Sequence, residues 1–264
     1  LGAAESGVGA AILAQKQGMD VFVSDMGSIK PKYKAMLDQH GIEWEEGHHT
    51  EERILAADEV VKSPGIPDKV PLIVKLKAQG TPIVSEIELA GRYTSAKMVC
   101  ITGSNGKTTT TSLIYHIFKQ AGLDAGLAGN IGHSLALQVA EQPHEWYVIE
   151  LSSFQLDNMY QFRADIAVLM NITPDHLDRY DFKFENYARS KMRILQNLRP
   201  EYRTPARVVA FSEQQPFPIA GAELALPGRH NLYNQMAAAY ACMAAGIPAD
   251  VIAEGLKTFP GNDV

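Results

Sequence analysis

The chain is poor in cysteine, with Cys100 and Cys242 as its only two, and both stand in apolar surroundings far apart in the sequence. This arrangement argues against a disulfide framework or a cysteine metal site and indicates core thiols of a reducing compartment. The chain also lacks any apolar run near the ~20 residues that a membrane span requires, and it shows no signal peptide, internal repeat or low-complexity tract. We therefore expect a cytoplasmic protein.

Positive charge is not in excess, since 24 Lys and Arg stand against 30 Asp and Glu, for a net charge of −6. No basic surface for nucleic acid is indicated, and the acidity is too mild to favour disorder. The 264 residues are 46% hydrophobic and 20% charged, values typical of a globular protein with one large or two ordinary domains.

The most informative segment is the loop at 102–108, which reads Thr-Gly-Ser-Asn-Gly-Lys-Thr. A buried-type strand at 98–101 precedes it, and a helical pattern follows as far as Gly122. This order directs backbone N–H groups at a polyphosphate, with Lys107 reaching the terminal phosphates and Thr108 meeting a magnesium ion. The first glycine of the usual P-loop is absent, because Ile101 occupies its position. A bare Gly-Lys-Thr also arises by chance, but the strand and the helix around it favour phosphate binding.

Residues 1–93 alternate strand and helix patterns and predict a Rossmann-like parallel-sheet domain. A glycine-rich turn at 2–9 runs into an apolar helix that ends near Gly18, and a strand at 20–24 ends at Asp25. This resembles a dinucleotide-binding signature, although the glycine spacing differs and the strand expected before Gly2 is missing, as if the chain began inside the motif. A strand at 59–62 then opens into a rigid turn at Ser63, and helices are expected at 70–79 and 86–93.

Residues 94–264 repeat the alternation and predict a central P-loop ATPase-type α/β domain. Strands are expected at 147–151, 164–171 and 208–211, and helices at 184–192, 231–245 and 249–258. The region 195–227 carries little periodic pattern. The predicted fold class is therefore α/β in both domains.

Several polar residues are candidates for chemistry in this second domain. Glu150 ends an apolar strand, where P-loop folds place a metal-binding carboxylate, although such acids are often simply solvated. His176 lies in a cluster at 171–180 that is equally compatible with a helix start capped by Asp175. Periodicity alone makes Lys191 an ordinary solvated lysine.

Three asparagines are also open to an ordinary explanation. Asn130 closes a glycine-rich loop at 126–132 of unknown purpose. Asn231 and Asn234 open an Ala-rich helix, where asparagine caps are routine.

Together these strings resemble the Mur ligases of peptidoglycan synthesis, and most closely the member that adds D-glutamate. The Thr-Gly-x-x-Gly-Lys-Thr loop is shared with all Mur ligases and with folylpolyglutamate synthetases. Glu-Leu-Ser-Ser-Phe-Gln-Leu at 150–156 and Asp-His-Leu-Asp-Arg-Tyr at 175–180 look specific to the D-glutamate-adding member. The resemblance runs in order through residues 63–66, 102–108, 129–132, 150–156, 171–180, 191–194 and 228–231.

The resemblance implies a role for each candidate. It makes Lys107, His176 and Lys191 catalytic, and it overturns the solvated interpretation of Lys191 by implying a carbamylated lysine near a second magnesium. The implied metal contacts are Thr108, Glu150, His176 and Lys191. The implied ATP contacts are Gly103, Ser104, Asn105, Gly106, Lys107, Thr108, Thr109, Asn231 and Asn234. The implied substrate contacts are Ser6, Asp25, Ser63, Asn130 and His176.

The implied reaction is an ATP-dependent ligation with two magnesium ions. The terminal carboxylate of UDP-N-acetylmuramoyl-L-alanine would become an acyl phosphate, and the amine of D-glutamate would then displace phosphate. A monomer is expected. Family members continue into a third domain that binds the amino acid, so a protein limited to these residues is expected to keep the UDP-substrate pocket but to ligate poorly.

Other functions remain open at this point. A different Mur ligase or a folylpolyglutamate synthetase would use the same chemistry with another acceptor. The turn at 2–9 and Asp25 leave a dinucleotide-dependent oxidoreductase as a second class, against which the ATP loop and Glu150 argue. A catalytically silent nucleotide-sugar binding module is the third.

Overall fold

The computed structural model describes residues 1–197, 208–212 and 214–261. The chain forms two compact units, and neither is continuous in sequence. Unit 1 comprises Leu1–Ser95, His133–Pro143 and Phe154–Phe162, and unit 2 comprises Ala96–Gly132, His144–Ser153 and Arg163–Val264. The division into domains at 1–93 and 94–264 stays a prediction, but two later segments of the chain pack with the first part.

Unit 1 contains two pairs of parallel strands. β1 (Phe22–Asp25) pairs with β2 (Glu43–Glu46), and β3 (Val60–Val61) pairs with β4 (Ile83–Val84). The first residues join the two pairs, because Gly2 N donates to Ser24 O (3.0 Å) and Ser63 N donates to Leu1 O (2.9 Å). The turn at 2–9 therefore lies beside the carboxyl ends of β1 and β3.

The helices of unit 1 cover these strands with apolar faces. Ile12 and Leu37 pack with Val23 in one cluster, and Ile73 and Leu76 pack with Val60 in another. The helices are α1 (Glu5–Lys16), α2 (Pro31–Gln39), α3 (Glu51–Leu55), α4 (Pro71–Ala78), α5 (Glu86–Gly91), α7 (Leu135–Glu141) and α8 (Ser153–Leu156). Proline opens α2 and α4 at a first-turn position, where its fixed φ suits the helix and its missing N–H costs nothing.

Unit 2 is built on a four-stranded parallel sheet in the order β6-β7-β5-β8. Its strands are β5 (Lys97–Thr102), β6 (Ala125–Gly129), β7 (Trp146–Glu150) and β8 (Ile166–Leu169). Glu150 stands opposite both Ile101 and Gly129 in the pairing register. Because parallel strands share their direction, the loops that follow them meet at one edge of the sheet.

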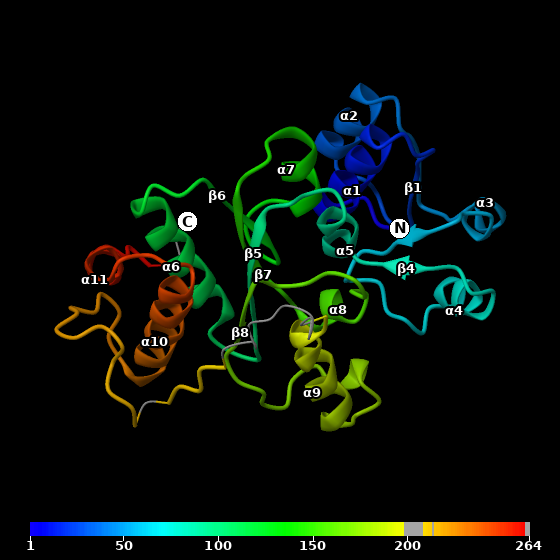
Figure 1. Cartoon of the computed structure of the whole chain (residues 1–264). Helices are drawn as coiled ribbons and strands as arrows, with labels where there is room; N and C mark the ends of the chain where they lie inside the picture. The colour runs from blue at the N-terminus through cyan, green and yellow to red at the C-terminus, as the bar shows by residue number, and fades with distance from the viewer. Residues whose placement is uncertain (198–207, 213, 262–264) are drawn as a thin grey trace. The chain divides into compact units, whose positions relative to one another are not determined.

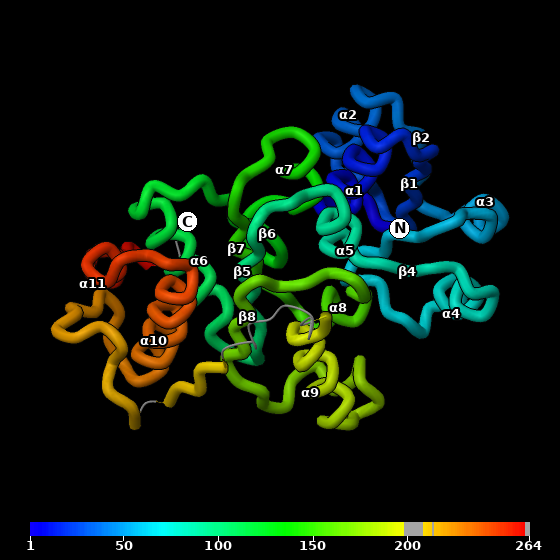
Figure 2. The backbone as a smooth tube through the Cα atoms, in the orientation of Figure 1, coloured from blue at the N-terminus to red at the C-terminus, as the bar shows by residue number. Residues whose placement is uncertain are grey.

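The helices of unit 2 are α6 (Lys107–Gln120), α9 (Phe184–Met192), α10 (Arg229–Ala244) and α11 (Ala249–Thr258), with short 3₁₀ turns η1 (Leu177–Arg179) and η2 (Arg193–Leu195). Figure 1 shows α6, α10 and α11 together, and their contacts with one another bear this out. Buried Leu113, Ile117 and Phe118 of α6 pack with Val99 of β5 and Cys242 of α10. Figure 2 traces the backbone from β5 through the glycine loop into α6.

The structure confirms the α/β class with parallel sheets and corrects three local predictions. Residues 208–211 form no strand, and Val208 is 87% exposed, so no strand in the described part of the chain covers it. The glycine-rich loop predicted at 126–132 is largely β6. The Ala-rich helix begins at Arg229, so Asn231 lies in its first turn and does not cap it.

No helix among the described residues is both long and apolar enough to cross a membrane.

Candidate functional site

The glycine loop between β5 and α6 has the backbone of a phosphate-binding turn. Gly106 precedes the helix with φ +83° and Gly103 has φ +151°, both in the region that disfavours side chains. A Cβ on Gly106 would lie 2.3 Å from Asn234 Oδ1, so α10 closes tightly on the loop. The Lys107 ammonium donates to Gly103 O (2.9 Å) and Ser104 O (3.0 Å), which places it over the loop.

The segment that follows β8 forms hydrogen bonds with this glycine loop. Ser104 N donates to Asn171 O (2.9 Å), and Asn105 N donates to the Asn171 side chain (2.9 Å). The Ser104 hydroxyl also lies 2.9 Å from the Tyr187 hydroxyl, whose burial raises its pKa. The backbone N–H groups of Ser104 and Asn105 therefore have protein partners. Thr109 follows in the first turn of α6.

Glu150 is the acidic residue at the centre of the site, and its side chain is only 1% exposed. Thr108 Oγ1 donates to its Oε2 (2.9 Å), and Asn130 Nδ2 donates to its Oε1 (2.8 Å). Gly129 permits this approach, because a Cβ there would lie 2.1 Å from Glu150 O. The structure thus brings together three sequence-predicted residues from α6, β7 and the end of β6.

The donor atoms at Glu150 suit a magnesium ion. A carboxylate and a threonine hydroxyl are hard oxygen donors, and Mg²⁺ is bound through one or two carboxylates together with substrate phosphates. Among the described residues there is no group of three or more His, Cys, Asp or Glu that could hold a metal ion by itself. One buried carboxylate beside a phosphate loop therefore fits a nucleotide-bound magnesium.

Lys191 is 2% exposed, so the prediction of a solvated lysine from periodicity is wrong. Its ammonium donates to Thr102 Oγ1 (3.5 Å) and lies 5.3 Å from the centre of the Tyr187 ring. The buried face of α9 also carries the polar Ser190, so counting apolar residues could not reveal it. Burial of a lysine ammonium carries a desolvation cost, which makes this residue chemically notable.

His176 stands in the neighbouring loop with 56% of its side chain exposed. Its φ is +47°, its N–H donates to Asp175 Oδ1 (2.9 Å), and its Nε2 lies 3.6 Å from Asp175 Oδ2. Asp175 does not cap a helix here, because the 3₁₀ turn begins at Leu177 without a side-chain cap. Asn231 on α10 donates to Pro227 O (2.8 Å). The ligand roles of both residues stay predictions.

The predicted UDP-substrate residues lie in unit 1. Asp25 ends β1 and accepts from Ala3 N (2.6 Å) and Gly27 N (2.8 Å), and Ser6 lies in the first turn of α1. The Ser63 hydroxyl is buried and has no hydrogen-bond partner among the described residues, and a Cβ on Gly2 would lie 2.4 Å from it. Such a polar atom beside a helix start needs a partner, which a bound ligand would supply.

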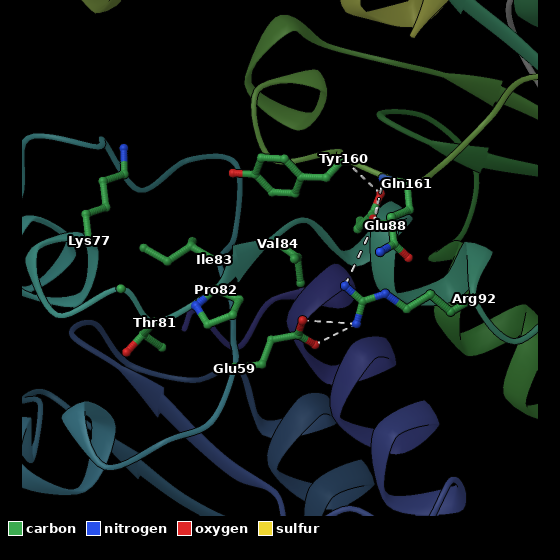
Figure 3. A pocket seen from close by; sticks show the side chains of 11 residues that line it. Glu59, Lys77, Thr81, Pro82, Ile83, Val84, Glu88, Arg92, Tyr160 and Gln161 are labelled. Atoms are coloured by element: carbon green, nitrogen blue, oxygen red, sulfur yellow. Dashed lines mark hydrogen bonds and ion pairs between the residues drawn. The ribbon is translucent and has the colours of Figure 1, made fainter. Parts of the chain in front are cut away.

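A cavity of about 520 Å³ opens in unit 1 at the other end of β3 and β4, and Figure 3 shows its lining. Its charged side chains already have partners. Arg92 binds both carboxylate oxygens of Glu59 (2.9 and 3.0 Å), and Lys77 pairs with Asp68 (2.7 Å). None of the residues predicted for chemistry lines this cavity.

Sequence reasoning missed Tyr187 and the polar role of Thr102. Thr102 Oγ1 accepts from Lys191 and donates to Leu151 O (2.7 Å), so it links β5, β7 and α9. Tyr187 and Lys191 are four residues apart on a helix, and this spacing was the available signal.

Comparison with known protein families identifies the family of this chain. Residues 101–215 match the Mur ligase middle domain, and residues 6–70 match the MurD N-terminal domain. The chain also superposes on a murein ligase from Neisseria meningitides (UDP-N-acetylmuramate:L-alanyl-gamma-D-glutamyl-meso-diaminopimelate ligase). The TM-score is 0.61 at 19% identity, covering 96% of this chain and 94% of that one. Because the identity is so low, the superposition is evidence for the fold alone. The chain belongs to the Mur ligase family.

Curated relatives indicate which members of the family this chain is similar to. A Bacteroides fragilis protein named UDP-N-acetylmuramoylalanine–D-glutamate ligase is 58% identical over 298 aligned residues. The alignment covers 99% of this chain and 67% of that protein. A Porphyromonas gingivalis protein of the same name is 52% identical, over 98% of this chain and 66% of its own length. The chain thus spans about two thirds of these relatives.

Proposed function

We propose that this protein is an ATP-dependent ligase that joins D-glutamate to UDP-N-acetylmuramoyl-L-alanine in peptidoglycan synthesis. The observation that carries the proposal is that the Glu150 carboxylate is buried and accepts a hydrogen bond from the hydroxyl of Thr108, the last residue of the phosphate loop. The 58% identity to a D-glutamate ligase supports the choice of substrate. The reaction belongs in the cytoplasm, where ATP is supplied.

The reaction proceeds in two substitutions. An oxygen of the alanyl carboxylate bonds to the γ-phosphorus of ATP and ADP leaves, which gives an acyl phosphate. The amine nitrogen of D-glutamate then bonds to the acyl carbon, phosphate departs, and the nitrogen loses its proton. Both steps bring anions together, so the protein's main task is to neutralise and align charge.

Each residue of the loop edge has a part in that task. Lys107, already placed over the loop, turns its ammonium to the transferring phosphoryl group, and the N–H groups at the start of α6 face the other phosphates. Thr108 and Glu150 hold magnesium, which when bound screens the phosphate charge. Asn130 orients Glu150 and reaches the alanyl end of the substrate. Gly103, Gly106 and Asn234 shape the ATP pocket.

Lys191 would hold a second metal ion together with His176 after its neutral amine has bonded to the carbon of carbon dioxide and lost a proton, which forms a carbamate. The buried position of Lys191 supports this, because carbamylation replaces a costly buried cation with an oxygen ligand. Replacing Lys191 with Ala should abolish ligation, and added short-chain carboxylates should restore part of it. Retained activity in Lys191→Ala, or loss without rescue, would remove this role.

In unit 1, Ser6, Asp25 and Ser63 face the uridine diphosphate of the substrate. The buried Ser63 hydroxyl, which has no hydrogen-bond partner in the part of the chain that the structure describes, supports this part of the proposal.

The deciding experiment measures phosphate release from ATP by the complete gene product with magnesium and the muramoyl substrate. D-Glutamate, L-alanine, meso-diaminopimelate and L-lysine are compared as acceptors. We expect release to depend on D-glutamate. Equal release with all four acceptors, or release with another acceptor alone, would contradict the proposal.

A further inference from the structure

A chain of hydrogen bonds in unit 1 runs from β2 through β1 to the loop that precedes α3. Ser24 of β1 and Glu45 of β2 stand opposite each other in the pairing of the two strands. The hydroxyl of Ser24, a residue that is only 1% exposed, lies 2.6 Å from Glu45 Oε1 and 2.6 Å from His49 Nδ1. This hydroxyl therefore connects a carboxylate to an imidazole at the edge where the two strands end.

Glu45 is ionised in this network. Burial by itself would raise the pKa of Glu45, but hydrogen bonds from Ser24 and Thr50 outweigh it and lower the pKa to about 2. Thr50 donates its backbone N–H to Glu45 Oε1 (2.7 Å) and its hydroxyl to Oε2 (2.5 Å). An ionised carboxylate can only accept hydrogen bonds. The single proton of the Ser24 hydroxyl is therefore donated to Glu45.

The direction of these bonds fixes the tautomer of His49. Because the Ser24 proton is donated to Glu45, the Ser24 oxygen accepts from His49, and Nδ1 must carry a proton. The second ring nitrogen, Nε2, has no hydrogen-bond partner within the described ranges of the chain, and it is not among the atoms sealed from solvent. The ring is thus anchored through one nitrogen, and the other can bind a ligand.

The imidazole borders the predicted substrate site. Leu1 and Asp25 lie close enough to His49 for their charges to act on its ring. The same two residues hold the glycine turn at 2–9 in place, since Asp25 accepts from Ala3 N (2.6 Å) and Leu1 O accepts from Ser63 N (2.9 Å). The Ser63 hydroxyl beside this turn is buried with no hydrogen-bond partner among the residues that the structure describes. A ligand bound there would satisfy it.

We infer that His49 binds the diphosphate of the nucleotide-sugar substrate as a cation: Nε2 takes up a proton when the substrate binds and donates it to a phosphate oxygen. The Ser24 hydroxyl and the Glu45 carboxylate stabilise the positive ring from its other side. This inference rests on the proposed function in taking the uridine diphosphate group as the ligand of unit 1.

The charges around His49 make this proton uptake depend on the ligand. Burial lowers the pKa of His49, and the Leu1 ammonium and His48 lower it further, while Glu45 and Asp25 oppose the fall. The ring is therefore mostly neutral near neutral pH when no ligand is bound. A diphosphate brings negative charge to Nε2 and favours the protonated form. The resulting cation also offsets the carboxylates of Asp25 and Glu45, which would otherwise repel a bound anion.

Proton uptake by the wild type is the first test and needs no variant. The complete gene product is titrated calorimetrically with UDP-N-acetylmuramoyl-L-alanine in two buffers of different ionisation heat at the same pH. The diphosphate is esterified at both ends and the alanyl carboxyl group has already lost its proton, so the ligand itself does not titrate near neutral pH. We expect a fraction of a proton to be taken up per bound substrate, and none when uridine is the ligand.

The affinity of the wild type should depend on pH in the same sense. Because the protonated ring binds the diphosphate better, affinity for the substrate should fall as pH rises. The expected loss is about tenfold between about pH 6 and about pH 9, the scale of one hydrogen bond to a charged group.

His49→Asn isolates the role of Nε2, because asparagine keeps an amide donor for Ser24 in the place of Nδ1 and lacks the second nitrogen. We expect this variant to bind the substrate about tenfold more weakly than the wild type at about pH 6 and equally at about pH 9. Its affinity for uridine should stay unchanged. His48→Asn is the matched control, since His48 is 65% exposed and its Nε2 also lies near Glu45 (3.1 Å from Oε2). It should keep the affinity and the pH dependence of the wild type.

Three results would overturn the inference. They are a wild type that takes up no proton with the substrate or does not bind it, a ratio of wild-type to His49→Asn affinity that stays the same at both pH values, and an equal loss of uridine affinity in His49→Asn. The last result would place the imidazole at the nucleoside. None of these measurements uses ATP or D-glutamate. A wild type that takes up the proton with its substrate but releases no phosphate with D-glutamate would therefore contradict the proposed function and not the role of His49.

Discussion

The protonation of Glu86 should make the stability of unit 1 depend on pH in a direction opposite to that of most carboxylates. Burial raises the pKa of this side chain from 4.5 to about 7 in the folded protein. Between these two pH values the folded state keeps a proton that the unfolded state has already lost. The free energy of unfolding therefore falls as pH rises through this window, and it is highest below pH 4.5 as far as this group is concerned.

The magnitude follows from the same two values. A difference of one pKa unit corresponds to about 1.4 kcal/mol, so the full loss across the window is about 3 kcal/mol. Glutamine at position 86 stays neutral and escapes this loss. Glu86→Gln should therefore gain stability relative to the wild type by up to about 3 kcal/mol as pH rises from 4.5 to 8.

Urea unfolding followed by tryptophan fluorescence measures this difference. Trp44 lies in unit 1 and Trp146 in unit 2, so a Trp146→Phe background makes Trp44 the reporter for the unit that contains Glu86. Comparing variant with wild type at each pH cancels the other titrating groups. Glu52→Gln on the exposed surface of α3 is the control and should show no trend. A Glu86→Gln difference that stays constant within about 0.5 kcal/mol from pH 4.5 to 8 would refute the reasoning.

Two further predictions concern the glycine loop and the thiols. Gly106→Ala should weaken nucleotide binding at least about tenfold, because left-handed strain of about 1 kcal/mol adds to a Cβ placed 2.3 Å from Asn234 Oδ1. Gly122→Ala, with similar φ and open space, should leave nucleotide affinity unchanged when the binding of both variants is measured by titration calorimetry. Burial raises the pKa of the Cys100 and Cys242 thiols, so a thiol reagent should label them only after denaturation. Rapid labelling of the native protein would contradict this.

Local chemistry could be predicted from the sequence where neighbours in the chain decide it. The strand, glycine turn and helix around Lys107 were found in the predicted order, and α9 and α11 have the predicted bounds. In these segments the helical spacing of apolar residues, the glycines that end helices and the apolar runs of strands all predict the same elements. The resemblance to Mur ligases, confirmed by the family match, added the expectation that Lys191 is not an ordinary surface lysine.

The sequence was a poor guide where distant contacts decide the outcome. β6 contains glycines and looked like a loop, but Gly129 allows its backbone to approach Glu150. Residues 208–211 have strand propensity but pair with no strand among the residues that the structure describes. Lys191 and Tyr187 lie on the buried face of α9. Because this face carries polar groups, the spacing of apolar residues along the helix does not predict that it is buried.

The candidate metal site depends on strand register as much as on residue identity. Thr108, Asn130 and Glu150 are far apart in the sequence and meet because three parallel segments end at one edge of the sheet. Tyr147, Val148 and Ile149 are all buried, so both faces of β7 are covered, and slipping the strand by one residue would turn every side chain to the opposite face. That slip would carry the Glu150 carboxylate away from both Thr108 and Asn130. The pairing of β7 with β5 and β6 therefore determines where the Glu150 carboxylate lies.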